Sequence, residues 1–291
     1  MTNEHLITAD TFRERQQSVM MEGIIDEPVE IRYTDVGSGP PLLLLHGIPT
    51  WSYLFQEMIT ELQDDYRVIV PDMLGYGYSD HRDRFDRSLH VQAEVVKRLM
   101  DELGLLKVHF VGHDIGGGVG LVLAVNDPDR LDTMMLANTI AYDSWPIEAM
   151  LKLGHPSWTE KPISEVQSFL ESAFQDGILH DEQRKDRFVE GITAPYTEEE
   201  GRKSLVRNAA ALNTNETTML THKLPEVQVP SLILWGTQDP WQQADFGRRL
   251  AEDLPHGSFV GFDDSGHWLP QEAPAAFAAE VKRFVQQRGS L

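Results

Sequence analysis

The chain has 291 residues, of which 41% are hydrophobic and 24% are charged, close to an ordinary soluble globular composition. Its 46 acidic and 25 basic residues give a net charge of −21. So negative a surface disfavours nucleic acid and membrane partners, because both are anionic. The chain contains no cysteine, which excludes disulfides, thiolate catalysis and cysteine-based metal sites.

The N-terminal segment, residues 1–18, has no basic patch followed by an apolar run, so no secretory signal is predicted. No stretch of the chain approaches the length of a transmembrane helix. Together with the absence of cysteine, these features lead us to expect a cytoplasmic protein. They predict no oligomeric state.

Short apolar runs recur along the chain and alternate with helical stretches. The run at 41–45 (PLLLL) is continuous, which is typical of a strand buried on both faces of a parallel sheet. Residues 87–104 repeat apolar side chains at helical spacing. Strands are predicted at 29–35, 41–45, 67–70, 107–111, 133–138, 231–235 and 258–262. Such alternation predicts an α/β fold with a mostly parallel sheet and helices on both faces.

The alternation of strand and helix stops between residues 140 and 220. Helices are predicted there at 147–153, 163–176, 181–190 and 198–213. Because the sheet resumes at 231, this insertion is expected to form a helical cap over the strand ends, where open α/β sheets bind ligands. We therefore divide the chain into a main domain, residues 1–139 and 221–291, and a cap, residues 140–220.

The motif at 111–118 (VGHDIGGG) follows an apolar strand and precedes an apolar helix. This is the context of the nucleophile elbow G-x-S-x-G, with Asp114 in the place of the serine. The alternative is a glycine-rich turn that binds phosphate, but an anionic Asp114 at its apex would repel phosphate. Asp114 is therefore the candidate nucleophile.

A second motif, His46-Gly47-Ile48-Pro49, directly follows the strand at 41–45. A simple turn at the end of a strand would account for it taken alone. Beside the Asp114 turn, however, the backbone N–H groups of Ile48 and Ile115 can form an oxyanion hole.

Two polar residues follow later strands. Asp239 comes after the strand at 231–235, and His267 after the strand at 258–262. Alone, Asp239 could belong to an ordinary polar turn, and a single histidine among 11 is usually structural. The order nucleophile, acid, histidine, each after a strand, instead predicts that His267 moves protons while Asp239 holds its tautomer.

With these motifs the chain resembles the α/β-hydrolase superfamily over residues 28–288, and its Asp114 resembles the haloalkane dehalogenase and epoxide hydrolase branch. Residues 46–55 (HGIPTWSYLF), 71–80 (PDMLGYGYSD) and 194–196 (APY) are most similar to dehalogenases. The resemblance implies a triad of Asp114, Asp239 and His267 and no cofactor. No metal is predicted either, because His46, His113 and His267 lack ligand spacing such as H-E-x-x-H.

A carboxylate nucleophile changes the reaction that such a triad performs. Asp114 can attack a saturated carbon to form an ester, which water activated by His267 then hydrolyses. A serine would form a stable ether instead. The sequence therefore predicts cleavage of a carbon–halogen or epoxide carbon–oxygen bond, with a small hydrophobic organic molecule and water as substrates.

The leaving-group site departs from the dehalogenase pattern. Dehalogenases stabilise the halide with a Trp after the nucleophile and a second Trp or Asn, but this chain has Ile115 and Ile48 at the corresponding positions. Another donor is then needed. The indole N–H groups are candidates, although apolar packing competes with this role at each tryptophan: Trp51, Trp145, Trp158 and Trp241.

Two alternatives remain open. Epoxide hydrolases protonate the leaving alkoxide with two cap tyrosines, for which Tyr142 and Tyr196 are available. A non-catalytic binding protein of the same fold is the third hypothesis, but degenerate members are expected to lose triad residues first.

Overall fold

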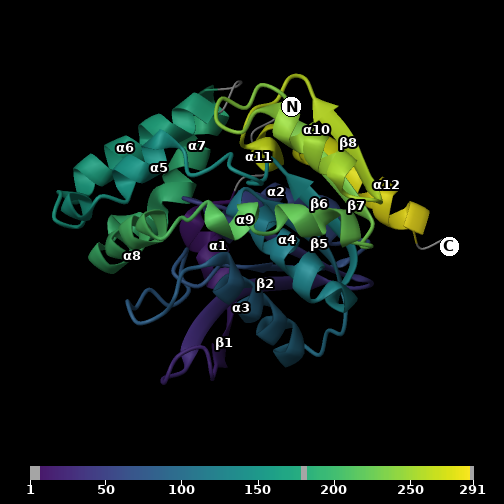
Figure 1. Ribbon diagram of the computed structural model, residues 1–291. Helices are drawn as coiled ribbons and strands as arrows, with labels where there is room; N and C mark the ends of the chain where they lie inside the picture. The colour runs from purple at the N-terminus through teal and green to yellow at the C-terminus, as the bar shows by residue number, and fades with distance from the viewer. Residues whose placement is uncertain (1–6, 178–181, 289–291) are drawn as a thin grey trace.

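The computed structural model describes residues 7–177 and 182–288 (Figure 1). In this part of the chain eight strands form one sheet in the order β1-β2-β4-β3-β5-β6-β7-β8. β1 and β2 pair antiparallel with each other, as do β2 and β4, whereas all later pairings are parallel. The strands are β1 Gln17–Met21, β2 Val29–Gly37, β3 Pro41–Leu45, β4 Arg67–Pro71, β5 Val108–His113, β6 Leu131–Ala137, β7 Ser231–Gly236 and β8 Gly257–Phe262.

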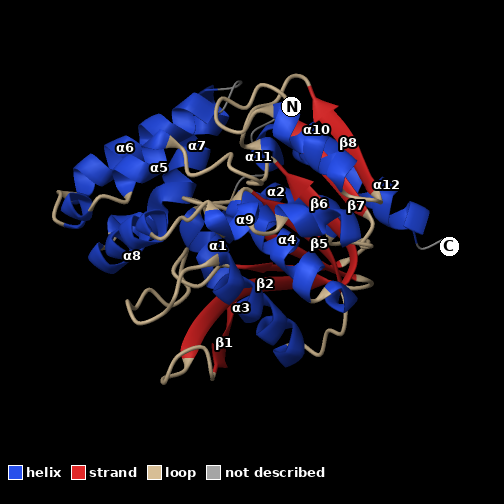
Figure 2. Cartoon of the chain, in the orientation of Figure 1, coloured by secondary structure: helices blue, strands red, loops and turns tan. Residues whose placement is uncertain are grey.

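Helices cover both faces of this sheet (Figure 2). Helices α3, α4 and α10 lie on one face, while α2 packs with α12 on the other (Figure 1). The helices around the sheet are α1 Ala9–Arg15, α2 Gln56–Leu62, α3 Leu89–Glu102, α4 Ile115–Asn126, α9 Asn215–Thr218, α10 Ala244–Asp253, α11 Leu269–Glu272 and α12 Pro274–Arg288. Short 3-10 helices lie at η1 Ser52–Phe55, η2 Pro128–Arg130, η3 Pro156–Thr159, η4 Ala194–Thr197 and η5 Thr221–Glu226.

Four longer helices occupy the insertion between β6 and β7. They are α5 Glu148–Leu153, α6 Ile163–Gly177, α7 Glu182–Thr193 and α8 Glu199–Ala210, and they cluster at one side of the sheet (Figure 1). Each has a counterpart among the helices predicted there. The division into main domain and cap stays a prediction, and residues 1–6, 178–181 and 289–291 lie outside the described part.

The predicted mostly parallel sheet is confirmed, and its parallel strands form where the sequence has apolar runs. In β3, Leu42 to Leu45 have no exposed surface, because helices cover both faces of the sheet. Edge strand β1 and helix α1 were not predicted. The QSVMM sequence of β1 neither alternates cleanly nor forms a long apolar run, and Met20 is 58% exposed. Within residues 7–177 and 182–288, no helix is both long and apolar enough to cross a membrane.

Candidate active site

Asp114 occupies a sharp turn between β5 and α4. Its backbone has φ 52° and ψ −123°, a conformation that is strained for a residue with a side chain. Neighbouring glycines make the turn possible: a Cβ on Gly112 would lie 2.6 Å from the carbonyl oxygen of Gly116, and one on Gly116 would lie 2.3 Å from that of Leu45. The turn therefore holds the Asp114 carboxylate at the carboxyl end of the sheet.

The predicted oxyanion N–H groups both face this carboxylate. The N–H of Ile48 donates to Oδ1 of Asp114 at 2.8 Å, and the N–H of Ile115 is a further donor to the same side chain. His46 fixes the loop that carries Ile48. Its Nδ1 lies 2.9 Å from the carbonyl oxygen of Gly47, and its Nε2 accepts the N–H of Met73. The two N–H groups are thus in place before any substrate binds.

Burial raises the pKa of Asp114 to about 6, even though the charge of His267 and the two N–H donors act in the opposite direction. The carboxylate is only 6% exposed. A poorly hydrated carboxylate is a stronger nucleophile than one surrounded by water, because little solvent has to be removed before attack.

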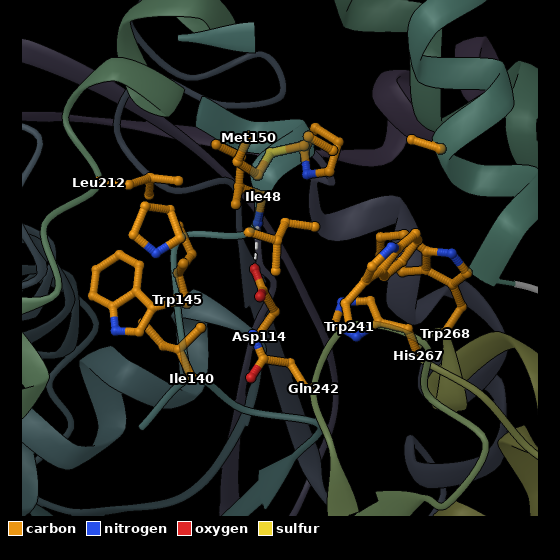
Figure 3. Close-up of a pocket in the computed structure, with 16 residues that line it drawn as sticks. Ile48, Asp114, Ile140, Trp145, Met150, Leu212, Trp241, Gln242, His267 and Trp268 are labelled. Carbon is orange, nitrogen blue, oxygen red and sulfur yellow. Dashed lines mark hydrogen bonds between the residues drawn. The ribbon is translucent and has the colours of Figure 1, made fainter. Parts of the chain in front are cut away.

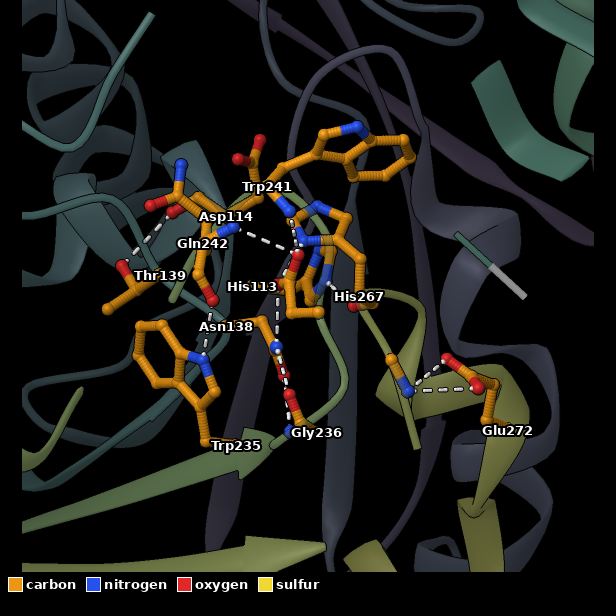
Figure 4. Close-up of polar contacts among 12 residues, drawn as sticks. His113, Asp114, Asn138, Thr139, Trp235, Gly236, Trp241, Gln242, His267 and Glu272 are labelled. Atoms are coloured by element: carbon orange, nitrogen blue, oxygen red, sulfur yellow. Dashed lines mark hydrogen bonds and ion pairs between the residues drawn. The ribbon is translucent and has the colours of Figure 1, made fainter. Parts of the chain in front are cut away.

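His267 and Asp239 form a directly bonded pair. Nδ1 of His267 lies 2.7 Å from Oδ2 of Asp239, and the same oxygen accepts Nδ2 of Asn138 at 2.7 Å. The other oxygen, Oδ1, accepts the backbone N–H groups of Trp241 and Gln242 at 2.8 and 2.9 Å (Figure 4). Four donors therefore surround Asp239, and the proton of neutral His267 is directed to Nδ1.

The pKa values of this pair move apart. Burial alone would raise the pKa of Asp239, but the charge of His267 and the hydrogen bonds from His267, Gln242 and Trp241 lower it below its usual value. Burial alone would lower the pKa of His267, but the charge and hydrogen bond of Asp239, together with the charge of Asp114, raise it. Asp239 therefore stays ionised, and His267 is a stronger base than a free imidazole.

His113, the residue before the nucleophile, supports the loop that carries His267. Its Nε2 lies 2.8 Å from the carbonyl oxygen of His267, so this nitrogen carries the proton. Burial lowers the pKa of His113 to about 3, and the ring is therefore neutral. Sequence reasoning gave His113 no role.

A cavity of about 40 Å³ opens beside the Asp114 carboxylate (Figure 3). Asp114 and His267 both line it, and so do residues of the insertion, including Trp145, Met150 and Leu212. A single water needs about 10–15 Å³ by this kind of measure. The cavity therefore suits a short substrate, and its largely apolar lining suits a hydrophobic one. Within the described residues, no group of three or more His, Asp or Glu side chains is placed to hold a metal ion.

The predicted tryptophan donors are placed differently from one another. Trp51 lies outside the cavity and donates its indole N–H to the carbonyl of Gly191 at 3.1 Å. Trp145 lines the cavity but donates to Oγ1 of Thr217 at 2.6 Å. Trp158 lies outside the cavity, under the ammonium group of Lys161. None of these three has the placement expected of a leaving-group donor, because each packs or bonds elsewhere.

The two tyrosine hydroxyls are also turned away from Asp114. Tyr142 donates to Oδ2 of Asp253 at 2.6 Å, and Tyr196 donates to the carbonyl of Thr50 at 3.3 Å. Neither lines the cavity. The structure therefore does not bring these tyrosines together over the nucleophile.

Three residues with free N–H groups do line the cavity. Trp241 was among the predicted donors, and its indole N–H donates to no other described residue. Gln242 and Trp268, which sequence reasoning missed as candidates, also line it, and the indole N–H of Trp268 is buried without a partner. Trp268 directly follows His267 and Gln242 comes three residues after Asp239, and this closeness to the predicted triad was the available signal.

Comparison with known proteins extends over most of the chain. A family model described as alpha/beta hydrolase fold matches residues 40–274. The chain is 29% identical over 277 residues to haloalkane dehalogenase 2 of Mycobacterium tuberculosis, covering 87% of this chain and 91% of that protein. It is 26% identical to cis-3-alkyl-4-alkyloxetan-2-one decarboxylase of Shewanella oneidensis, covering 90% of this chain and 87% of the relative.

A solved structure is also similar to this chain over most of its length. An esterase from Thermogutta terrifontis superposes with a TM-score of 0.79 at 26% identity, over 94% of this chain and 99% of that chain. The similar proteins thus carry several activities, and the chemistry of the site has to distinguish among them.

Proposed function

We propose that this chain, which belongs to the alpha/beta hydrolase fold family and is a hydrolase, displaces halide from a saturated carbon as a haloalkane dehalogenase does. One observation carries the proposal: a buried carboxylate, Asp114, stands at the apex of the strand-to-helix turn and faces an apolar cavity (Figure 3). Attack of Asp114 on an ester would give a reactive anhydride, whereas attack on a saturated carbon gives an ordinary ester.

The first step forms a bond from an Asp114 oxygen to carbon while the carbon–halogen bond breaks and the halide keeps the electron pair. His267 then takes a proton from water, and the resulting hydroxide attacks Cγ of the ester. The N–H groups of Ile48 and Ile115 stabilise the oxyanion. The expelled alkoxide takes the proton from His267, and Asp114 loses its own proton to solvent. Alkyl halide and water thus become alcohol, halide and a proton.

The charges of the site favour this order of events. The negative charge of Asp114 is one of the factors that raise the pKa of His267. Esterification removes that charge, so the pKa of His267 falls when Asp114 is alkylated. His267 is therefore released as a neutral base at the stage where a water molecule has to be deprotonated.

Epoxide opening is less well supported. An alkoxide leaving group needs an acid, and the Tyr142 and Tyr196 hydroxyls are turned away from the cavity. The donors that line it, on Trp241, Gln242 and Trp268, are indole and carboxamide N–H groups, which do not release protons near neutral pH. A halide needs only donors because it departs as a stable anion.

The pH dependence follows from Asp114. Its pKa is raised to about 6, so at lower pH the group is protonated and cannot attack. We expect the rate of the first halide release to increase as pH rises through about 6 and then to level off. Stopped-flow halide detection with excess enzyme measures this rate. A rate that does not change between about pH 5 and about pH 7 would contradict the assignment of Asp114 as nucleophile.

Isotope labelling tests the covalent step. With enzyme in excess over a short bromoalkane in water labelled with oxygen-18, the alcohol of the first turnover should contain unlabelled oxygen from Asp114. The label should instead enter the peptide that contains Asp114, as read by mass spectrometry after proteolysis. Labelled alcohol in the first turnover would mean direct attack by water and would overturn the proposal.

A further inference from the structure

We propose that the carboxamide of Gln242 binds the departing halide and replaces the side chains that Ile48 and Ile115 cannot provide. This inference rests on the proposed function. Gln242 lines the cavity together with Asp114 and is itself 2% exposed. Figure 3 shows its carboxamide beside the Asp114 side chain, where a leaving group would emerge.

The backbone of Gln242 is fixed on both sides without help from its side chain. Its N–H donates to Oδ1 of Asp239 at 2.9 Å, and its carbonyl accepts the indole N–H of Trp235 at 2.9 Å (Figure 4). The same backbone segment that orients the catalytic acid therefore sets the position of the carboxamide. Any residue with a backbone N–H and carbonyl could make these two bonds, so they do not explain a glutamine.

The side chain has no structural partner to account for its polarity. Oε1 of Gln242 is buried and accepts no hydrogen bond from the described residues. A half-turn of the carboxamide would only place its nitrogen at the same buried position without a partner. Burying an unpaired polar atom is unfavourable, and a leucine of similar size would avoid that cost. The polar group is therefore better explained by what its N–H end binds in the cavity.

A carboxamide N–H suits a halide and does not suit a group that must be protonated. It stabilises the negative charge that develops on the halogen as the carbon–halogen bond breaks, and it neither gains nor loses a proton. Trp241, the residue before it, lines the same cavity, and its indole N–H donates to no other described residue. The pair Gln242 and Trp241 thus offers two neutral donors on one segment, and the small cavity restricts the substrate to short haloalkanes.

Gln242→Leu tests this role with Gln92→Leu as its matched control. Gln92 is also buried, but both ends of its carboxamide bond to the backbone of Leu74, outside the cavity. Gln242→Glu keeps the shape of the side chain while replacing the N–H donor with a carboxylate. Halide release is measured with 1-chloro-, 1-bromo- and 1-iodopropane. Halide binding is measured with sodium bromide, through the quenching of tryptophan fluorescence, below pH 6, where Asp114 is uncharged.

We expect Gln242→Leu to slow the first halide release by about 100-fold, with the largest loss for chloride, because the poorest leaving group depends most on the donor. Bromide should bind about tenfold more weakly or worse. Gln242→Glu should impair the first halide release at high pH, where the introduced carboxylate is charged. Gln92→Leu should lower the melting temperature and leave both halide measurements unchanged.

The outcomes separate this inference from the proposed function. If the wild-type enzyme forms an ester but Gln242→Leu releases and binds halide normally, the role of Gln242 is refuted and the function stands. A large loss in Trp268→Phe combined with normal Gln242→Leu would refute it equally, by assigning the site to the buried Trp268 N–H. If the wild-type enzyme forms no ester, the proposed function itself fails.

Discussion

His267→Phe should convert the enzyme into one that forms its ester intermediate and then stops. Asp114 keeps its buried carboxylate and its two N–H donors, so alkylation continues. The base that activates water is lost, so turnover should fall by about 10⁴-fold or more. Intact-protein mass spectrometry after incubation with a short bromoalkane should show one added alkyl group, located on Asp114 by peptide mapping.

The pH of that experiment is set by the effect of His267 on the pKa of Asp114. His267 lowers the pKa of Asp114 from the value that burial alone would impose, so its removal raises that pKa. The incubation should therefore be run well above pH 6. Asp114→Asn is the matched control, since it keeps the shape of the side chain and should form no ester.

Two results would count against this mechanism. Normal turnover by His267→Phe would remove the histidine from the reaction. Binding of haloalkanes by the wild-type protein without any turnover would favour the non-catalytic binding protein of the same fold.

Most of the sheet could be predicted because its buried strands have recognisable local sequence patterns. The apolar runs from 41–45 to 231–235 correspond to strands β3 to β7, since a parallel sheet covered on both faces selects continuous apolar residues. Strand β1 escaped prediction because it lies at the sheet edge and is held there by pairing with β2. Its own residues carry little of that information.

The parts of the site that could be predicted all directly follow strands. Asp114 and Asp239 come just after β5 and β7, and the parallel topology places these strand ends at one edge of the sheet. Asn138 follows β6 in the same way and bonds to Asp239, but nothing in its immediate sequence distinguishes it from an ordinary turn residue.

The leaving-group residues could not be predicted because side-chain direction depends on tertiary partners. Trp145 lines the cavity and Tyr142 lies near it in sequence, yet their side-chain donors bond to Thr217 and Asp253. Conversely, Gln242 faces the cavity because Asp239 and Trp235 fix its backbone. Thr217 and Asp253 lie on α9 and α10, and only the folded chain brings them to these side chains.

Asp239→Asn should impair turnover by about 10⁴-fold, close to the effect expected for losing the acid of such a triad. An asparagine that keeps its oxygen on the backbone N–H groups of Trp241 and Gln242 must present its NH₂ group to His267 and Asn138. His267 would then accept at Nδ1 and carry its proton on Nε2, which is the wrong tautomer for a base. The first halide release should survive, because Asp114 is unchanged, so stopped-flow assays should show a burst followed by very slow turnover.

A double variant distinguishes this explanation from simple damage to the fold. In Asp239→Asn the NH₂ group faces Nδ2 of Asn138, so two donors oppose each other where one hydrogen bond of 2.7 Å exists now. Asn138→Asp combined with Asp239→Asn restores a donor facing an acceptor and returns the negative charge to the same strand ends. Because the introduced asparagine still presents its NH₂ group to Nδ1 of His267, the tautomer stays wrong, and the double variant should regain melting temperature without regaining turnover. Recovery of turnover by the double variant would contradict the tautomer explanation and would favour simple damage to the fold in Asp239→Asn.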